Sequence, residues 1–406
     1  MKILHFFITR IFLKRWTLVL GMIILLFLAN YLSFTAARSI ISTFQGYQEI
    51  ETLNQEGTFI ANLDPNSEAD FDRIEIDDTK KVYEYLNNNY TYAMQVDGFV
   101  TSLYNKYKME VSFNYINEEA YKINQFRLSQ GNHLNFNYKF NKEEIPVLVG
   151  AGLATTYPVG SNIEITDPVT QQLVNLKVQG VLEKNTHRSN FYAPNSKNYF
   201  NFSIFLPINE EFIQSAGLDL LVNGLMDMVL LDSTKEKATN LSEIIQENLG
   251  LKFNFFNQQE NFNYFEDSYF DSLKIICIIT FILLLIIVCL AIWNTLVSIR
   301  LMIKDFTINL LVGLSYSKLR AIFYSYFGIL FSINLAILFV ITAFNRCGFW
   351  LKKDSIFATY GMFGLISMDW IALLIVLFID LIIGFTIVEL TIKKIKSIPI
   401  SVGVLN

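Results

Sequence analysis

Few residues in this sequence have the types and spacing that catalysis requires. The only histidines are His5, His133 and His187, which are too scattered to predict a metal site. Ser189 could be paired with His187, but the sequence has no G-x-S-x-G motif. It also lacks H-E-x-x-H, C-x-x-C and the G-x-x-x-x-G-K-[ST] loop that cradles ATP phosphates. We therefore predict no catalytic residue, no metal site and no cofactor site in this chain.

One run of carboxylates has the residue type that binds divalent cations. The run is made of Asp70, Asp72, Glu75, Asp77 and Asp78. Its spacing is not that of an EF-hand, because the glycine and the distal glutamate are missing. We favour a solvated acidic surface over a cation site.

A single carboxylate, Asp380, lies in the middle of an apolar run, LFIDLIIGF. At mid-bilayer it costs at least about 2.5 kcal/mol, so it must face protein or be protonated. No Lys or Arg lies at this depth, and Asn30 and Asn334 are the polar candidates for partners. We favour a hydrogen bond between helices, while a switch at a dimer interface and proton coupling stay open.

The segment 300–320 is the best candidate for a docking site. It holds four Lys/Arg and one acid, Asp305, between two long apolar runs, which predicts a cytoplasmic loop. Its apolar residues recur at roughly helical spacing and predict a surface helix along the membrane. An exposed acid followed by a turn at Gly313 suits a docking surface, and the alternative is an ordinary loop with an interfacial helix.

Four apolar runs frame these residues, and each is about as long as the roughly 20 residues that a spanning helix needs. We predict spans at 16–40, 271–299, 321–344 and 369–390. A basic amphipathic helix at 1–15 and a basic tail at 391–406 place both termini inside. Residues 41–270 then form a large outer domain, and 345–368 form an outer loop.

Charge and composition separate the outer domain from the spans. Residues 44–268 hold 31 acids and 16 Lys/Arg, a net charge of −15, whereas the rest of the chain has a net charge of +10. Such an acidic domain disfavours nucleic acid as a partner. It contains none of the three cysteines, so it has no disulfide. Alternating strand patterns mixed with helical patterns predict an α+β fold.

This layout resembles the FtsX/MacB-type permeases of ABC transporters, the type VII group that includes the LolC/LolE subunits. The family connector reads roughly Arg-x-x-Glu-Ile-Gly-Ile, then four residues, then Gly-Ala-Ser. Here Asp305-Phe306-Thr307-Ile308 and Gly313-Leu314-Ser315 stand at those places, although Met302 replaces the family arginine. FRLSQGNHL, PVLVGAGLATTYPVGSNIEI and VQGVLEKN are similar to the periplasmic core domain, and SIPISVGVL looks like the closing signature.

The resemblance implies a membrane α-helical permease with a MacB-like outer domain in the bacterial cytoplasmic membrane. It implies a cytoplasmic ATPase partner that binds ATP and Mg²⁺, a second permease copy or paralogue, and in some systems an outer adaptor. Its mode is mechanotransmission, in which ATP-driven movement reshapes the outer domain to export or extract a peptide, antibiotic or lipid-linked substrate. The residues that it assigns to ATPase coupling are Asp305, Phe306, Ile308, Leu311, Gly313, Leu314 and Ser315.

Two other functions remain open at this stage. An FtsX-like protein uses the same coupling to activate a cell-wall hydrolase, although such outer domains are usually shorter. A sensor or immunity protein would act without ATP. Co-purification with an ATPase separates the sensor from the other two, and the identity of an outer partner separates transport from hydrolase activation.

Overall fold

The computed structural model describes residues 2–51, 53, 55–67, 70–190, 193–257, 259–260, 263, 271–352 and 356–397. The chain divides into two compact units. The helical unit consists of Met1–Ile41, Ser272–Asn345 and Leu365–Asn406. The body consists of Ser42–Asp271 and Arg346–Gly364.

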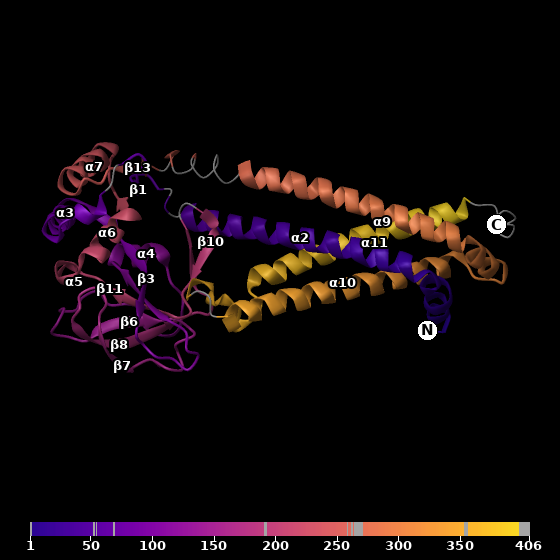
Figure 1. Cartoon of the computed structure of the whole chain (residues 1–406), viewed down its shortest axis with the longest axis horizontal. Coiled ribbons are helices and arrows are strands. Elements are labelled where there is room, and N and C mark those ends of the chain that lie inside the picture. Colours follow the sequence, from indigo (N-terminus) through magenta and orange to yellow (C-terminus); the bar gives the residue numbers. More distant parts are fainter. Residues whose placement is uncertain are drawn as a thin grey trace. The chain divides into compact units, whose positions relative to one another are not determined.

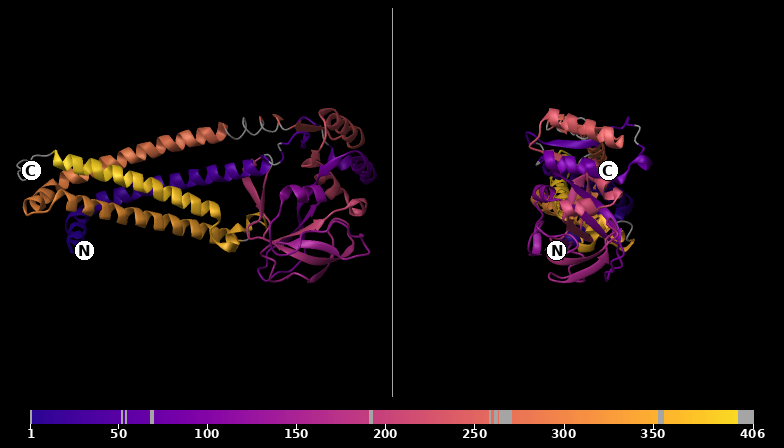
Figure 2. Two further views of the ribbon diagram at one scale, coloured as in Figure 1. Left: turned by 180° about the vertical axis from the view of Figure 1, so that it is seen from behind. Right: turned by 90° about the vertical axis from the view of Figure 1, so that its left-hand side faces the viewer.

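Four helices are long and apolar enough to cross a membrane: α2 (Trp16–Glu51), α9 (Asp271–Leu311), α10 (Tyr316–Lys352) and α11 (Ser367–Lys396). Together with the mixed body described below, they confirm a membrane helical protein with a large α+β domain. The start of α2, the α9–α10 turn and the end of α11 lie at one end of the helical unit (Figures 1 and 2). This placement is the one that four antiparallel helices require.

The segment 300–320 differs from the prediction of a separate surface helix. α9 continues without interruption through residue 300 and ends only at Leu311. The sequence contains no Gly or Pro between residues 271 and 312, and charged side chains by themselves do not stop a helix. The first half of the segment is therefore a continuation of the helix that forms the second candidate span.

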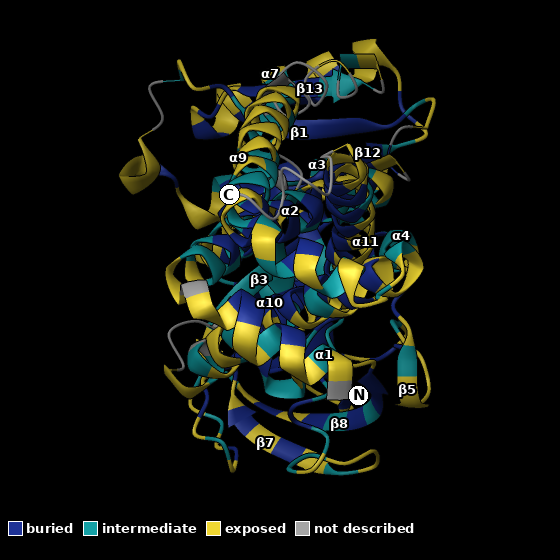
Figure 3. Cartoon of the chain, turned by 90° about the vertical axis from the view of Figure 1, so that its right-hand side faces the viewer, coloured by how far each residue is buried: buried dark blue, intermediate teal, exposed yellow. Residues whose placement is uncertain are grey.

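α9 differs from the other three helices in burial. In its most apolar window only 6% of the residues are buried, against 33–44% in the other helices. Figure 3 shows α9 mostly in the colours of exposed and intermediate residues. The second half of α9 packs in the main core of the helical unit through Ala291, Ile299, Met302 and Phe306, whereas its most apolar window is largely uncovered.

The body contains a four-stranded antiparallel sheet in the order β13-β1-β12-β2. Its strands are Phe253–Asn257, Phe59–Leu63, Val229–Leu231 and Thr91–Ala93. Residues 59 and 60 pair with 230 and 229 on one side and with 257 and 256 on the other. β1 is therefore an inner strand, which agrees with its apolar sequence.

The second sheet has seven strands, with β3-β4-β11-β6-β8-β5 in order and β7 paired to β8. The strands are Gln95–Thr101, Val111–Ile116, Ser203–Pro207, Ile145–Val149, Leu173–Leu182, Leu128–Gly131 and Asn162–Thr166. β4 pairs with β11 in parallel, as does β6 with β8. All residues of β4 and β11 are buried, so both faces of the sheet are covered at its centre.

Three of the five helices described in the body begin at a residue whose side chain caps them. The five helices are α3 (Ile76–Asn89), α4 (Glu118–Asn124), α5 (Glu210–Ser215), α6 (Leu218–Met226) and α7 (Lys235–Leu249). The side chains of Asn117, Asn209 and Thr234 accept the first free amides of α4, α5 and α7. A hairpin of β9 (His187–Asn190) and β10 (Ala193–Tyr199) completes the body.

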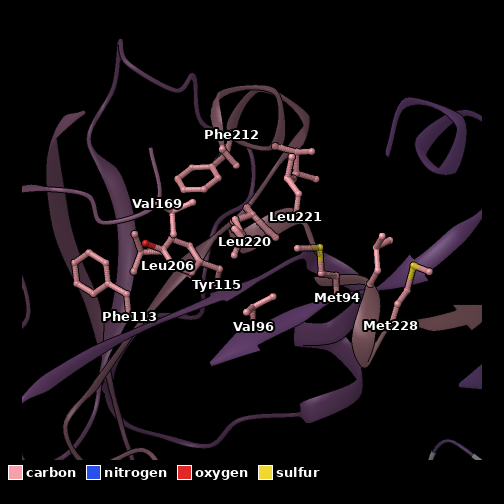
Figure 4. Packing of buried hydrophobic residues seen from close by; sticks show 14 of the residues in the cluster. Met94, Val96, Phe113, Tyr115, Val169, Leu206, Phe212, Leu220, Leu221 and Met228 are labelled. Carbon is pink, nitrogen blue, oxygen red and sulfur yellow. The ribbon is translucent and has the colours of Figure 1, made fainter. Parts of the chain in front are cut away.

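Side chains from the large sheet and from α5 and α6 interlock in the main core of the body (Figure 4). Tyr115 and Phe212 are fully buried there, with ring centroids 5.6 Å apart. The Tyr115 hydroxyl donates to the buried carboxylate of Asp167 at 2.5 Å. Asp167 also accepts from the amide of Thr170 at 2.7 Å, which ties the β7–β8 turn to the core.

The predicted outer loop 345–368 is largely part of the body, because Arg346–Gly364 belongs to that unit. The Trp350 ring stacks on the Phe202 ring, with ring centroids 5.5 Å apart and an angle of 19° between the ring planes. Asn201 donates to the carbonyl of Thr359 at 3.3 Å. Arg346 is 4% exposed, and its guanidinium lies 4.6 Å from the Tyr360 ring centre. The charge of Arg346 thus lies against an aromatic face.

We predict that Trp350→Ala lowers the free energy of unfolding by about 2 kcal/mol, below the usual range for a large aromatic because Trp350 is half-buried. The change removes the stacking on Phe202 and an edge contact with Tyr107 at 5.5 Å. Thermal unfolding of the full chain in detergent measures it. Trp293→Ala is the control, since Trp293 is 71% exposed. Equal effects of the two changes would contradict an anchoring role for Trp350.

Candidate functional site

The connector between α9 and α10 is a tight turn at Gly313, which has φ +104°, a conformation that favours glycine. The amide of Leu314 donates to the carbonyl of Asn309 at 3.0 Å, as in a Schellman motif. Ser315 caps α10, because its hydroxyl accepts from the amide of Lys318 at 3.3 Å. Gly313 and Ser315 are exposed. The local sequence therefore fixes both the end of α9 and the start of α10.

Three apolar side chains beside this turn form what we call the connector surface. Ile308 is 44% exposed, Leu311 59% and Val312 84%. Asp305 and Leu314, also predicted for coupling, are half-buried. Neighbouring exposed apolar side chains at a helix end are typical of a surface that another protein covers.

Phe306, the remaining predicted coupling residue, is fully buried. Its ring stacks on the Phe7 ring, with centroids 6.2 Å apart and an angle of 14° between the planes. Its centroid also lies 6.2 Å from that of Phe12 and 5.5 Å from that of Phe323. Phe306 therefore positions the connector from the inside and does not form its outer surface.

The N-terminal segment provides half of this aromatic cluster. It runs as α1 (Lys2–Phe6), a π-helix (Phe7–Phe12) and a 3₁₀ turn (Leu13–Arg15) directly into α2. Its apolar residues Phe7, Ile11 and Phe12 are buried in the same cluster as the connector and α10. The predicted amphipathic helix thus uses part of its apolar face to hold the connector, a contact that periodicity alone does not reveal.

Exposed cations gather at the connector end of the helical unit. Arg320 pairs with Glu389 at 3.1 Å, and the Tyr324 hydroxyl donates to Glu389 at 3.0 Å. The exposed basic residues of the connector, the N-terminal segment and the end of α11 are Arg10, Lys14, Arg300, Lys304, Lys318, Arg320, Lys393, Lys394 and Lys396. This distribution is the one that the positive-inside rule associates with the cytoplasmic side.

The predicted intramembrane polar residues lie in one layer of the helical unit. Two apolar clusters each draw side chains from α2, α10 and α11. Between the two clusters lie the buried polar residues Asn30 and Ser33 on α2, Asn334 on α10 and Asp380 on α11. The Asn30 amide donates to Asp380 Oδ2 at 2.9 Å. Asn334 instead donates to the carbonyl of Leu330 in its own helix at 3.0 Å.

We expect Asp380→Asn to leave the stability of the helical unit unchanged or higher. The amide keeps an acceptor for Asn30 and removes a buried carboxylate. Asp380→Leu should cost about 0.6–2 kcal/mol, because the Asn30 amide loses its acceptor. Thermal unfolding in detergent compares both with Thr386→Val on the exposed face of α11. Strong destabilisation by Asp380→Asn would instead favour a role for the charge itself.

A second tie in the helical unit joins α2 to the start of α11. Arg38 Nε lies 3.2 Å from Asp369 Oδ1, and the Asp369 side chain is fully buried. Asp369 Oδ2 also accepts from the amide of Ile366 at 3.2 Å and so caps the helix. Sequence analysis missed this pair, because its two residues are far apart in the chain and only packing brings them together.

The last turn of α2 is held to the β9–β10 hairpin, within the body, by Glu49. Its carboxylate accepts from the Ser189 amide at 2.9 Å and lies 3.1 Å from His187 Nε2 and 3.4 Å from Lys197 Nζ. Lys197 also donates to Gln45 at 3.3 Å. The Lys197 side chain is 3% exposed. Burial lowers the pKa of Lys197, and the Glu49 carboxylate acts in the opposite direction.

The other candidates from the sequence remain separate features. His187 Nδ1 donates to the carbonyl of Asn185 at 2.9 Å, and Nε2 lies 3.1 Å from Glu49. The Ser189 hydroxyl has no hydrogen-bond partner among the described residues. In the acidic run, Asp70 pairs with Arg73 and Asp78 with Lys81 on the surface. Among the described residues no group of three potential metal ligands occurs. The predicted closing signature lies outside the described residues, apart from Ser397.

No family model matches the chain, and a search of curated proteins gave no match. Among solved structures, the extracellular domain of the noncanonic ABC-type transporter YknZ from Gram-positive bacteria is similar to this chain. The matched region covers 50% of this chain and 100% of the YknZ domain, at 13% identity and a TM-score of 0.32. The periplasmic region of MacB from Actinobacillus actinomycetemcomitans covers 54% of this chain and 96% of its own, at 14% identity and a TM-score of 0.33.

Proposed function

We propose that this chain is the membrane-spanning permease subunit of an ABC transporter whose ATPase is a separate protein. The observation that carries the proposal is the connector surface, which exposes three apolar side chains at the basic end of the helical unit. A turn held rigidly by Gly313 and by the buried Phe306 ring is suited to receive a partner. That partner would bind ATP and Mg²⁺.

In this proposal the connector passes movement of the ATPase to the body. α9 is one helix from the connector to Asp271, where the body begins, so a displacement at Leu311 moves a stiff rod. The N-terminal segment, stacked on Phe306, continues into α2, which enters the body at Ser42. The body would then change shape and act on a peptide, antibiotic or lipid-linked substrate at the outer face of the cytoplasmic membrane, with both chain termini inside.

A second copy or a paralogue of the chain completes the proposed transporter. In this proposal the second copy packs against the largely uncovered α9, and van der Waals contacts between helices would drive the association. An outer adaptor is a further proposed partner. The FtsX-like alternative uses the same transmission of movement from the ATPase to the body. It differs only in the effect of that movement, which is to activate a cell-wall hydrolase.

The test is a pull-down of the tagged chain from native membranes in mild detergent, followed by an ATPase assay of the eluate. We expect an ATP-binding protein to co-elute and Asp305→Lys to remove it. Asp219→Lys, on the exposed face of α6 in the body, is the control and should retain it. If the chain elutes alone and without ATPase activity, the permease function is wrong and a sensor that acts without ATP is favoured.

A further inference from the structure

Two adjoining cavities lie within the body, beside the hairpin that Glu49 holds. The first has a volume of about 180 Å³ and lies against the last turn of α2, α4 and β9. The second has a volume of about 420 Å³ and extends along β3. Four residues line both cavities: Gln95, Arg188, Ser189 and Asp227. The two spaces therefore share one polar wall.

The rest of the lining of the first cavity is mixed, because Glu49, Asn124, Gln125 and His187 line it together with six apolar residues. The apolar residues that line it are Ile50, Leu53, Ala93, Ala120, Ile123 and Val229. An apolar cavity of about 150 Å³ is enough to bind benzene. This space is therefore large enough for one bulky apolar group, such as an aromatic side chain.

The shared wall is made of polar and charged groups. The Ser189 side chain is 2% exposed, and its hydroxyl has no hydrogen-bond partner among the described residues. Arg188 pairs with Asp97 at 3.5 Å. Burial raises the pKa of the Asp227 carboxyl, and the nearby Arg188 guanidinium acts in the opposite direction. The lining of the second cavity holds two carboxyls, Asp97 and Asp227, and one guanidinium, Arg188, so this lining has an excess of negative charge.

The second cavity adds groups that match a peptide backbone. Carboxamides from Gln95, Asn190, Asn198 and Asn223 line it. A carboxamide presents both a donor and an acceptor, as a peptide group does. A ligand with amide groups would therefore find partners along the second cavity while its side chains reach the shared wall and the first cavity.

We propose that these cavities form a binding site for a cationic peptide segment, with a bulky apolar residue in the first cavity and a neighbouring amine at Asp227. The positive charge of such a peptide complements the body, which has a net charge of −15 over residues 44–268. The proposal names a substrate class for the transporter proposed above and rests on that function only for its role in export. Because Ile50 and Leu53 follow Glu49 along the chain, an occupant would also contact the part of the chain that α2 brings into the body.

Direct binding tests the site without an ATPase. The full-length chain in nanodiscs of neutral phosphatidylcholine is titrated into fluorescein-labelled Gly-Phe-Lys-Gly-amide, and anisotropy is recorded against empty nanodiscs. Gly-Phe-Glu-Gly-amide and Gly-Ala-Lys-Gly-amide with the same label serve as matched peptides. We expect the Phe-Lys peptide to bind at least about tenfold more tightly than either, because only it satisfies both cavities.

Two variants locate the binding. Asp227→Asn should weaken the binding of the Phe-Lys peptide about tenfold. It should leave the weak binding of the Phe-Glu peptide unchanged. Asp219→Asn, an exposed carboxylate on α6, should change neither. Ala120→Phe, which fills the first cavity, should abolish the preference for Phe over Ala. Equal binding of all three peptides, no binding, or equal effects of Asp227→Asn and Asp219→Asn would overturn the site, while ATPase co-purification would still stand.

Discussion

Replacing both Leu311 and Val312 by serine is expected to reduce the ATPase that co-purifies with the chain at least about tenfold. The two side chains are 59% and 84% exposed, so their loss leaves the helical unit folded. In a complex they would be buried, and each contributes about 1.5–3 kcal/mol. A loss of about 1.4 kcal/mol already corresponds to tenfold in affinity. The measurement is the ratio of ATPase to permease in the eluate.

The matched control replaces an equally exposed pair elsewhere in the helical unit. Val340 on α10 and Leu374 on α11 are 62% and 64% exposed. Their double serine variant removes the same side-chain types at a distance from the turn. If this variant loses as much ATPase as the Leu311/Val312 variant, the connector surface has no special role in docking.

Replacing Glu49 by methionine is expected to lower the free energy of unfolding by about 3 kcal/mol. The Lys197 ammonium, whose side chain is 3% exposed, would lose its carboxylate partner, and the Ser189 amide would lose its acceptor. Thermal unfolding of the purified full chain reports the change. Glu51→Met is the control on the same helix, because Glu51 is exposed.

A double-mutant cycle separates the ion pair from a general effect on the helix end. Lys197→Met in the Glu49→Met chain should recover most of the lost stability, since the charge left without a partner is then removed as well. A double variant as unstable as Glu49→Met alone would assign the loss to the Ser189 amide or to packing. The cycle therefore tests whether charge holds the end of α2 to the hairpin.

The Glu49 and Phe306 contacts give α2 a defined attachment at each end. Near its start, Phe7 and Phe12 pack on Phe306 of the connector. At its last turn, Glu49 contacts His187 and Lys197 in the body. A helix fixed in this way is suited to pass displacement along its length, which is the property that the proposed mechanism requires.

Local sequence determined the spanning helices and the turn between two of them. Apolar runs are a property of consecutive residues, so the four spans can be identified without any partner. Gly313 likewise predicts a helix end, because the conformation it adopts there is a local preference. The prediction of a separate surface helix in the segment 300–320 was wrong. Polar residues there were interpreted as the end of the preceding helix, whereas only Gly and Pro, through their backbone chemistry, end a helix efficiently.

Tertiary structure decided which distant residues meet. The apolar neighbours of Asp380 predict that it lies deep in a spanning helix. Its hydrogen-bond partner, Asn30 and not Asn334, depends on how α2 and α11 pack. The Glu49–Lys197 pair and the stacking of Trp350 on Phe202 have no signal in the spacing of the residues. Hydrophobic periodicity states only that a face is buried. The partner of that face is set by the shape of the packed chain, and so the cavity beside Glu49 appears only in three dimensions.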